Sequence, residues 1–263
     1  FKVNDGATAS VHASTTTNNT NAANLVVSDG GTLVTEGNLV NAATANIQVG
    51  GVLNLKKGFT NDGTASFELA GGNVGTVEFS GNAAQTVEGT TVTQFENLRM
   101  NNVNGLTLNV DAELSDSLLF SDGIITTAAF KLEMTGTSES FVHGQGTGKY
   151  VVGNLRRNLI DGITYTLPIG SSSYYEEAEI LVNSSTGLTH VDLVYTTSAE
   201  TVPSGLQVNG KNVDNFLDYG YWTLNPNSGV SAVNYNFQGT NIGHADLGGI
   251  QDNYSLISDI GSG

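Results

Sequence analysis

A pair of glycines recurs at a regular interval near the start of the chain, and this spacing constrains the fold more than any other feature. Gly30-Gly31 is followed by Gly50-Gly51, and a third pair, Gly71-Gly72, comes one residue late. The two blocks also agree at aligned positions: Leu33 with Leu53, Leu39 with Phe59, Asn41 with Asn61, Thr44 with Thr64, Ala45 with Ala65, Ile47 with Phe67 and Val49 with Leu69. A repeat of about 20 residues is typical of architectures in which each unit stacks on its neighbours.

Within each repeat, short segments of alternating apolar and polar residues are separated by glycine-containing corners. Such alternation, in residues 24–27, 45–49, 66–69 and 76–79, predicts short half-buried strands. Glycines at the corners permit the backbone angles of tight turns. We therefore predict an all-β chain that begins with a β-solenoid, with a right-handed β-helix as the favoured form. It would occupy residues 1–145 in coils of about 20 residues, and the late third glycine pair would mark a coil longer by one residue.

The pattern changes at Gly144–Gly148, where we place a domain boundary. The strands that follow are longer and richer in aromatic residues, and they fall at 163–167, which Pro168 ends, and at 177–182, 190–195, 219–224 and 233–237. Their spacing favours an antiparallel β-sandwich over residues 146–263. Because the chain opens at Phe1 and stops soon after an apolar segment, we expect a piece of a longer protein whose sandwich is truncated at its C-terminal end.

The charge balance excludes several classes of partner. Nine Lys and Arg residues stand against 25 Asp and Glu, which gives a formal charge of −16. Nucleic acid and anionic membrane surfaces both require basic patches, so neither is expected as a partner. The chain has no cysteine and hence no disulfide or thiolate metal site. It also lacks an apolar run long enough to span a bilayer, so we expect no insertion into a membrane.

Several short phrases, taken in order, resemble a known group of proteins. They are Val77-Glu78-Phe79-Ser80-Gly81, the run from Phe95 to Asn102, the run from Tyr150 to Arg157, Leu167-Pro168-Ile169-Gly170 and Tyr221-Trp222. This series, within residues 60–240, is similar to repetitive secreted surface proteins of Bacteroidota, including adhesin-like proteins exported by the type IX secretion system. The resemblance implies a β-helical stalk that passes into a β-sandwich, displayed on the cell surface or released. It carries no catalytic residues.

A shorter phrase, Asp116-Ser117-Leu118, resembles the motif of an Asp, a Ser or Thr and an apolar residue that is used for O-glycosylation in the same phylum. The resemblance makes Ser117 a candidate for modification.

The aligned repeats do not place catalytic carboxylates together. Glycoside hydrolysis requires two carboxyl groups facing one groove. In the alignment Glu36 lies over Lys56, Gln48 over Glu68 and Ala42 over Asp62, so no acidic pair stacks. We therefore predict a protein without catalytic residues.

The densest acidic and aromatic cluster is formed by Tyr174, Tyr175, Glu176, Glu177 and Glu179. Ca²⁺ requires six to eight converging oxygen atoms, and the chain has no calcium-loop motif. We thus predict no cofactor, with Ca²⁺ as the weaker alternative, and regard Tyr174 and Tyr175 as possible glycan or partner contacts.

Trp222 is the one tryptophan of the chain and lies near Tyr219 and Tyr221. An aromatic ring of this kind either stacks on a sugar or belongs to the sandwich core. Aromatic residues lining a groove would support a glycan site, and burial would weigh against it.

Arg156 and Arg157 are the only adjacent arginines. Neighbouring residues of a strand point to opposite faces, so we expect one of them to reach a carboxylate and form an interdomain salt bridge.

Together these features predict a non-enzymatic, extracellular module with a structural or adhesive role, acting as a stiff stalk or filament segment on the outside of the outer membrane. Its partners would be other copies, flanking domains of the same chain, or extracellular glycans. The alternative is a carbohydrate-binding or polysaccharide-degrading β-helix protein.

Overall fold

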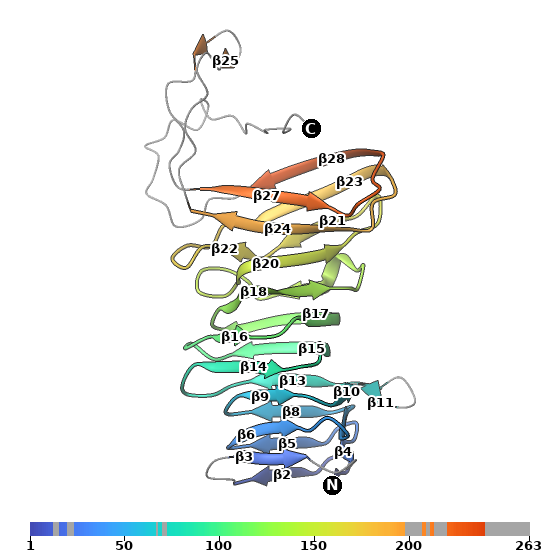
Figure 1. Cartoon of the computed structure of the whole chain (residues 1–263), viewed down its shortest axis with the longest axis vertical. Coiled ribbons are helices and arrows are strands. Elements are labelled where there is room, and N and C mark those ends of the chain that lie inside the picture. Colours follow the sequence, from blue (N-terminus) through green and yellow to red (C-terminus); the bar gives the residue numbers. More distant parts are fainter. Residues whose placement is uncertain are drawn as a thin grey trace.

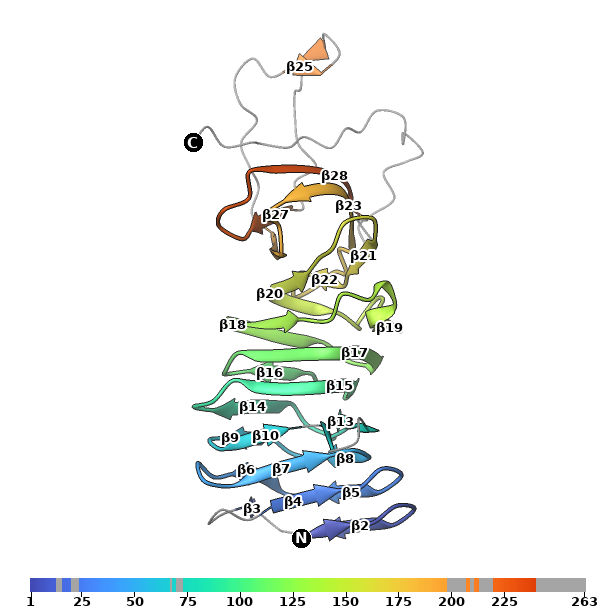
Figure 2. The ribbon, with the colours of Figure 1, turned by 90° about the vertical axis from the view of Figure 1, so that its right-hand side faces the viewer.

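The computed structural model describes residues 1–12, 16–19, 24–66, 68–69, 73–197, 207–208, 211–212 and 220–239. Its strands wind into a β-solenoid of about seven turns, with the N-terminal coil at one end and antiparallel strands at the other (Figure 1). A view turned by 90° shows the coils lying one above another (Figure 2). The predicted fold class is confirmed. A single short 3₁₀ helix, η1 (Glu139–Phe141), interrupts the strands of the described residues.

The coils build three faces by parallel pairing, and on the first face the ladder from β1 to β10 is separate from the ladder that starts at β15. The first face holds β1 (Lys2–Val3), β4 (Asn24–Val27), β7 (Asn46–Val49) and β10 (Thr64–Ser66), and then the first part of β15 (Thr93–Asn101), the first part of β17 (Ala112–Asp122), the later part of β18 (Ile125–Met134) and that of β20 (Val151–Asn158). The second face holds β2 (Thr8–Val11), β5 (Thr32–Thr35), β8 (Val52–Leu55), β13 (Thr76–Phe79), the later parts of β15 and β17, and β19 (Val142–His143). The third face holds β3 (Thr16–Asn19), β6 (Asn38–Asn41), β9 (Phe59–Asn61), β14 (Gln85–Gly89), β16 (Leu106–Leu108), the first parts of β18 and β20, and β22 (Ile169–Gly170).

Part of the predicted repeat alignment is confirmed residue by residue. Leu33 pairs with Leu53, and its neighbours on β5 and β8 pair with the same offset in sequence. On the third face Leu39 pairs with Phe59 and Asn41 with Asn61. The apolar members of these pairs are buried, and the two asparagines form an internal ladder in which Asn41 Nδ2 donates to Asn61 Oδ1 at 3.0 Å.

The rest of the alignment is wrong. On the first face Thr64 pairs with Asn46 and Ala65 with Ile47. The sequence separation between paired residues is therefore shorter here than on the other two faces. As a result, the predicted pairs from Thr44 to Val49 are out of register. After Ser66 the chain leaves the face, because β11 (Glu68–Leu69) and β12 (Asn73–Val74) pair antiparallel as a hairpin. The side chain of Phe67 lies outside the described residues.

The glycine pairs mark stacked corners, as predicted, and the reason is close contact between corners. A Cβ atom on Gly51 would lie 2.2 Å from the carbonyl oxygen of Gly31, closer than any side chain tolerates. The corner that stacks next on Gly51 is Gly75. Thr76, the residue after Gly75, pairs with Val52, the residue after Gly51. The prediction of a coil longer by one residue is therefore wrong, since the inserted hairpin lengthens this coil by more than that. Gly71-Gly72 lies outside the described residues.

β20 is the strand at which strand direction changes. It pairs parallel with β18 on one side and antiparallel with β24 (His190–Thr196) on the other, and β24 pairs antiparallel with β27 (Tyr221–Pro226). A second antiparallel sheet contains β21 (Thr164–Leu167), β23 (Ala178–Thr186) and β28 (Ala232–Gly239). Two short strands, β25 (Gln207–Val208) and β26 (Lys211–Asn212), form a separate antiparallel pair. Parallel pairing thus continues beyond residue 145, through β20 and β22.

A single apolar core runs through both parts of the structure. Its buried members extend from Val3 in the first coil to Tyr195 on β24 and form one cluster. Trp222 of β27 contacts Phe237 of β28, with ring centroids 5.9 Å apart, so the two antiparallel sheets face each other across this core. The solenoid interior and the sandwich interior are therefore continuous.

Candidate functional site

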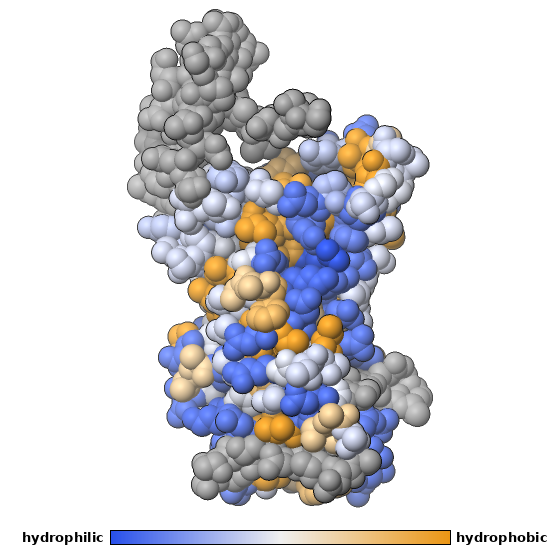
Figure 3. Space-filling view, viewed as in Figure 1, coloured by the Kyte–Doolittle hydropathy of each residue, from blue (hydrophilic) through white to orange (hydrophobic). Residues whose placement is uncertain are grey.

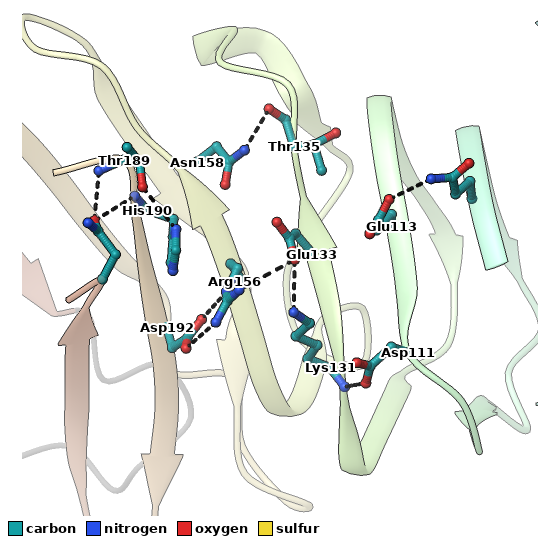
Figure 4. Close-up of polar contacts among 12 residues, drawn as sticks. Asp111, Glu113, Lys131, Glu133, Thr135, Arg156, Asn158, Thr189, His190 and Asp192 are labelled. Atoms are coloured by element: carbon teal, nitrogen blue, oxygen red, sulfur yellow. Dashed lines mark hydrogen bonds and ion pairs between the residues drawn. The ribbon is translucent and has the colours of Figure 1, made fainter. Parts of the chain in front are cut away.

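Three of the four ion pairs between described residues lie on the first face, where parallel strands give way to antiparallel ones. Arg156 on β20 donates from Nε to Asp192 Oδ1 at 2.5 Å and from Nη2 to Asp192 Oδ2 at 2.8 Å. Its Nη1 lies 3.6 Å from Glu133 Oε2 on β18, which Lys131 Nζ also approaches at 3.0 Å (Figure 4). Arg156 therefore links the last solenoid strands to the first antiparallel strand by ion pairs.

The hydrogen bonds between these groups favour their charged forms. The bonds with Asp192 raise the pKa of Arg156 above its ordinary value, and partial burial opposes this change. The same bonds hold the pKa of the Asp192 carboxyl below its ordinary value. A bidentate arginine–carboxylate pair is among the stronger polar contacts in proteins.

These ion pairs belong to a longer row of polar residues in strand register. The row crosses four strands of the first face and the antiparallel β24 and β27, and it consists of Gln94, Glu113, Glu133, Arg156, Asp192 and Asn225. Hydrophilic residues predominate on the side of the molecule seen in Figure 3, and hydrophobic residues occur there in small separate groups. Several adjacent members of the row bond to one another, as when Gln94 Nε2 donates to Glu113 Oε2 at 2.8 Å. The row is a polar ladder whose bonds lie within the protein.

The row contains a stacked acidic pair, Glu113 and Glu133, that the sequence comparison missed because the regular period ends before these coils. A glycosidase needs one of its two carboxyl groups to hold a proton and face the substrate. Glu133 instead lies between Lys131 and Arg156, and Glu113 accepts from Gln94. This is the arrangement of a structural ladder.

Arg157 lies on the opposite side of β20 and points into the protein, as the alternation of a strand requires. It is 1% exposed, and burial lowers its pKa to about 10. Its Nη1 and Nη2 donate to the carbonyl oxygens of Gly136 and Ser138 at 2.6 and 2.5 Å. The guanidinium also lies 4.3 Å from the ring centre of Phe141 and 4.8 Å from that of Tyr165. Arg157 thus holds the segment around η1 against the solenoid.

The predicted aromatic contacts are separated by the structure. Tyr174 is 42% exposed, whereas Tyr175 is buried, packs on Tyr150 and donates its hydroxyl to Glu177. Trp222 packs against Tyr195 and Phe237, and its Nε1 donates to the carbonyl oxygen of Glu176 at 2.9 Å. Of the three rings, Tyr174 is exposed, Trp222 is half-buried and Tyr175 is buried, so the three residues are not displayed together as one exposed surface.

The acidic cluster is divided in the same way. Glu176 is buried beneath Tyr150 and Tyr195, whose pKa values burial raises, with a smaller contribution from the charge of Glu176. Glu177 and Glu179, of the same segment, are only half-buried. Within the ranges that the structure describes, no three His, Asp or Glu side chains converge as metal ligands would.

Ser117 lies where β17 bends from the first face to the second. Its hydroxyl donates to Asn97 Oδ1 on β15 at 2.5 Å, and the side chain is half-buried. Attachment of a sugar at this position would require the bond to Asn97 to break.

Comparisons with known proteins do not add to these observations: no family model, curated protein or solved structure matches the chain. The fold and the contacts described above are therefore the basis for any functional assignment. They define a β-solenoid protein with an antiparallel end. No helix of the described residues is long and apolar enough to cross a membrane.

Proposed function

We propose that the chain is a non-enzymatic structural module that acts as a stiff stalk or filament segment of an extracellular or cell-surface protein. The observation that carries this proposal is the unbroken core and sheet that join the first coil to the antiparallel strands. A rod of this kind has no flexible linker between its two parts, because β20 belongs to both. It would transmit force along its length and hold an attached domain away from a surface.

The resemblance to secreted surface proteins of Bacteroidota supports the extracellular location and export by the type IX system. The negative charge of −16 supports solubility outside the cell and argues against an anionic partner. An enzymatic role has less support, because the in-register acidic pair of the first face is bonded to cations and an amide.

Assembly into filaments is a specific form of this proposal. Within the described residues, β1, β2 and β3 of the first coil pair on one side only, with β4, β5 and β6. Unpaired strand edges favour association with further strands. These edges would be covered either by another copy or by a flanking part of a longer chain.

Solution scattering and negative-stain electron microscopy of the 263-residue chain would test the proposal. We expect particles with a single elongated shape and a narrow distribution of lengths. Globular particles, or two bodies hinged at variable angles, would contradict a stiff stalk. Regular fibres would assign the open edges to self-assembly, and separate rods would assign them to flanking sequence.

A separate measurement would test whether the chain catalyses a reaction. The chain would be incubated with a panel of neutral and acidic polysaccharides, and new reducing ends or unsaturated products would be assayed. We expect no turnover. Release of either product, abolished by Glu133→Gln but retained by Asp116→Asn, would replace the structural proposal with a carbohydrate-degrading one.

A further inference from the structure

We propose that a groove on the third face, between β16, β18 and β20, binds a neutral saccharide. This inference rests on the proposed surface role and names a ligand class for it. The groove has a volume of about 400 Å³ and is lined by residues that include Val103, Asn104, Thr107, Asp122, Thr126 and Ser172. This volume falls within the range of about 300–1,000 Å³ that small-molecule sites occupy.

The floor of the groove follows from strand register. Thr107 on β16 pairs with Thr126 on β18, which pairs with Val152 on β20, so three outward side chains form one column across the strands. Three walls come from corners between the second and third faces, namely the turn that carries Val103 and Asn104, the corner at Asp122 and the turn near Gly148. The fourth wall is the loop at Ser172, which follows β22.

Within the described part of the chain, the polar side chains of the groove have no partners in the protein. No hydrogen bond or ion pair there engages the side-chain atoms of Asn104, Thr107, Asp122, Thr126 or Ser172, although Thr107 and Thr126 are in register. This contrasts with the first face, where the in-register polar row is bonded internally. It contrasts also with the second face, where Glu78 accepts from both Asn54 and Asn101. The groove therefore keeps its hydroxyl, amide and carboxylate groups available to a ligand.

The chemistry of the lining selects the ligand class. Three hydroxyls, one amide and one carboxylate offer both donors and acceptors, while Val103 and Val152 offer apolar surface. Among the described residues, no lysine, arginine or histidine lines the groove, so an anionic ligand would find no counter-charge there. Ca²⁺ would need six to eight oxygen ligands, and Asp122 is the one carboxylate of the described lining. A neutral sugar, with hydroxyl groups on its edge and C–H groups on its faces, matches this set.

A peptide strand is a poorer match. β16, β18 and β20 each have paired neighbours on both sides, so their backbones have no free edge that an extended peptide could join. Recognition at this site must depend on side chains and on exposed corner atoms.

Two of the walls are held together by contacts within the protein. Asn102 is buried and its Nδ2 donates to Ala83 O at 2.7 Å, while its Oδ1 accepts from the backbone of Asn104 at 2.9 Å. Gly123 adopts a φ of +89°, and a Cβ atom there would lie 1.9 Å from Asn102 O, so the two corners are in direct contact. Binding to a preformed site avoids the entropic cost of ordering loops.

The affinity of one site should be weak. The described lining offers no aromatic ring for stacking, and its single charged group supplies the strongest bond available. Weak sites gain strength when several copies engage one polymer, which is the situation of a stalk displayed in many copies on a surface.

The test is a titration of the isotope-labelled 263-residue chain with maltose, cellobiose, xylobiose and chitobiose, followed by backbone amide NMR. Digalacturonic acid is the acidic comparison. We expect at least one neutral disaccharide to shift the amides of Gly105, Thr107, Gly123 and Thr126 in a saturable manner, and the acid to bind more weakly. Absence of saturable shifts with every neutral sugar, shifts confined to another face, or equal binding of the acid would overturn the proposal.

Matched variants separate recognition from folding. Asp122→Ala should weaken binding about tenfold, because it removes a charged hydrogen-bond acceptor, whereas Asp116→Ala on an exposed bend should leave binding unchanged. Thr126→Val should weaken it by a smaller factor, and Thr60→Val, on β9 of the same face and outside the groove, should not. Equal effects of test and control variants would overturn the assignment. The shape of the particles is measured without ligand. A titration that shows no sugar binding therefore leaves the proposed stalk role standing, and particles that are not rods leave the binding result intact.

Discussion

The carboxylate of Asp192 accepts two hydrogen bonds from the guanidinium of Arg156, one from Nε at 2.5 Å and one from Nη2 at 2.8 Å. The two residues lie opposite each other on strands that run in opposite directions. Arg156 also faces Glu133 across a parallel pair. One side chain thus connects both kinds of strand pairing.

Removing this carboxylate should destabilise the junction. We expect Asp192→Asn to lower the free energy of unfolding by about 1–2 kcal/mol, a value kept modest because solvent screens a partly exposed pair. Urea denaturation followed by circular dichroism would measure it. Asp116→Asn, an exposed aspartate on the bend of β17, serves as the control and should have no measurable effect. An equal loss in both variants would show that the ion pair does not stabilise the fold.

The same pair should make stability depend on acidity. The folded-state pKa of Asp192 is lowered from 3.8, so its contribution is present above that ordinary value and is lost as the pH falls through the lower folded value. We expect the stability difference between wild type and Asp192→Asn to be constant from pH ~7 to pH ~5 and to shrink toward zero below pH ~3. Unfolding curves at several pH values would measure it, and a difference that grows in acid would contradict the assignment.

Arg157 should contribute more than Arg156 despite having no carboxylate bonded to it in the described structure. Arg157→Met would leave the carbonyl oxygens of Gly136 and Ser138 without these donors, and we expect a loss of about 2–4 kcal/mol. Arg157→Lys should recover little, since an ammonium cannot reproduce the planar fork. Arg99→Met, in a half-exposed arginine, is the control. Protease cleavage near η1 would report whether the segment 135–141 is released.

Stacked corners should reject a methyl group where two backbones touch. Gly51→Ala places Cβ 2.2 Å from Gly31 O, and we expect a cost of about 2–3 kcal/mol from overpacking. Gly162→Ala is the comparison, because Gly162 has open space but a φ of +83°, so its cost should be about 1 kcal/mol from backbone strain alone. Thermal unfolding would rank the two, and the opposite order would show that the corners can move apart.

Trp222 should behave as a packing residue. Trp222→Ala removes contacts with Tyr195 and Phe237 and the bond to Glu176 O, and we expect about 3 kcal/mol of lost stability. Tyr174→Ala, in an exposed ring, should stay within about 0.5 kcal/mol. Unchanged stability after loss of Trp222, with reduced sugar binding, would return this residue to a recognition role.

Sequence periodicity predicted the architecture because each inward row repeats an apolar or amide side chain. Leu33 over Leu53 and Asn41 over Asn61 are readable from spacing alone. The pairing of Asn46 with Thr64 is not, because a coil can shorten on one face and lengthen at the next corner while keeping its core filled. The alternation of apolar and polar residues within one strand carries no information about such compensation between coils.

The polar features show the same division. Alternation along β20 predicted that Arg156 and Arg157 face opposite ways, but the partners of each lie on other strands and turns, far away in the sequence. The Glu113–Glu133 pair and the groove beside Thr126 lie in coils of irregular length, where alignment of repeats fails. Both depend on which strands become neighbours, and this is a property of the whole stack.

The reversal at β24 has a consequence for the size of the assembly. A parallel stack has no intrinsic length, since each coil presents to the next the same edge that it received from the one before. β24 runs against β20, and with it the chain ceases to offer a template for another coil in the original direction. Within the described residues the two ends of the structure therefore differ: β1, β2 and β3 present unpaired edges that match a further parallel coil, whereas the strands at the other end pair antiparallel.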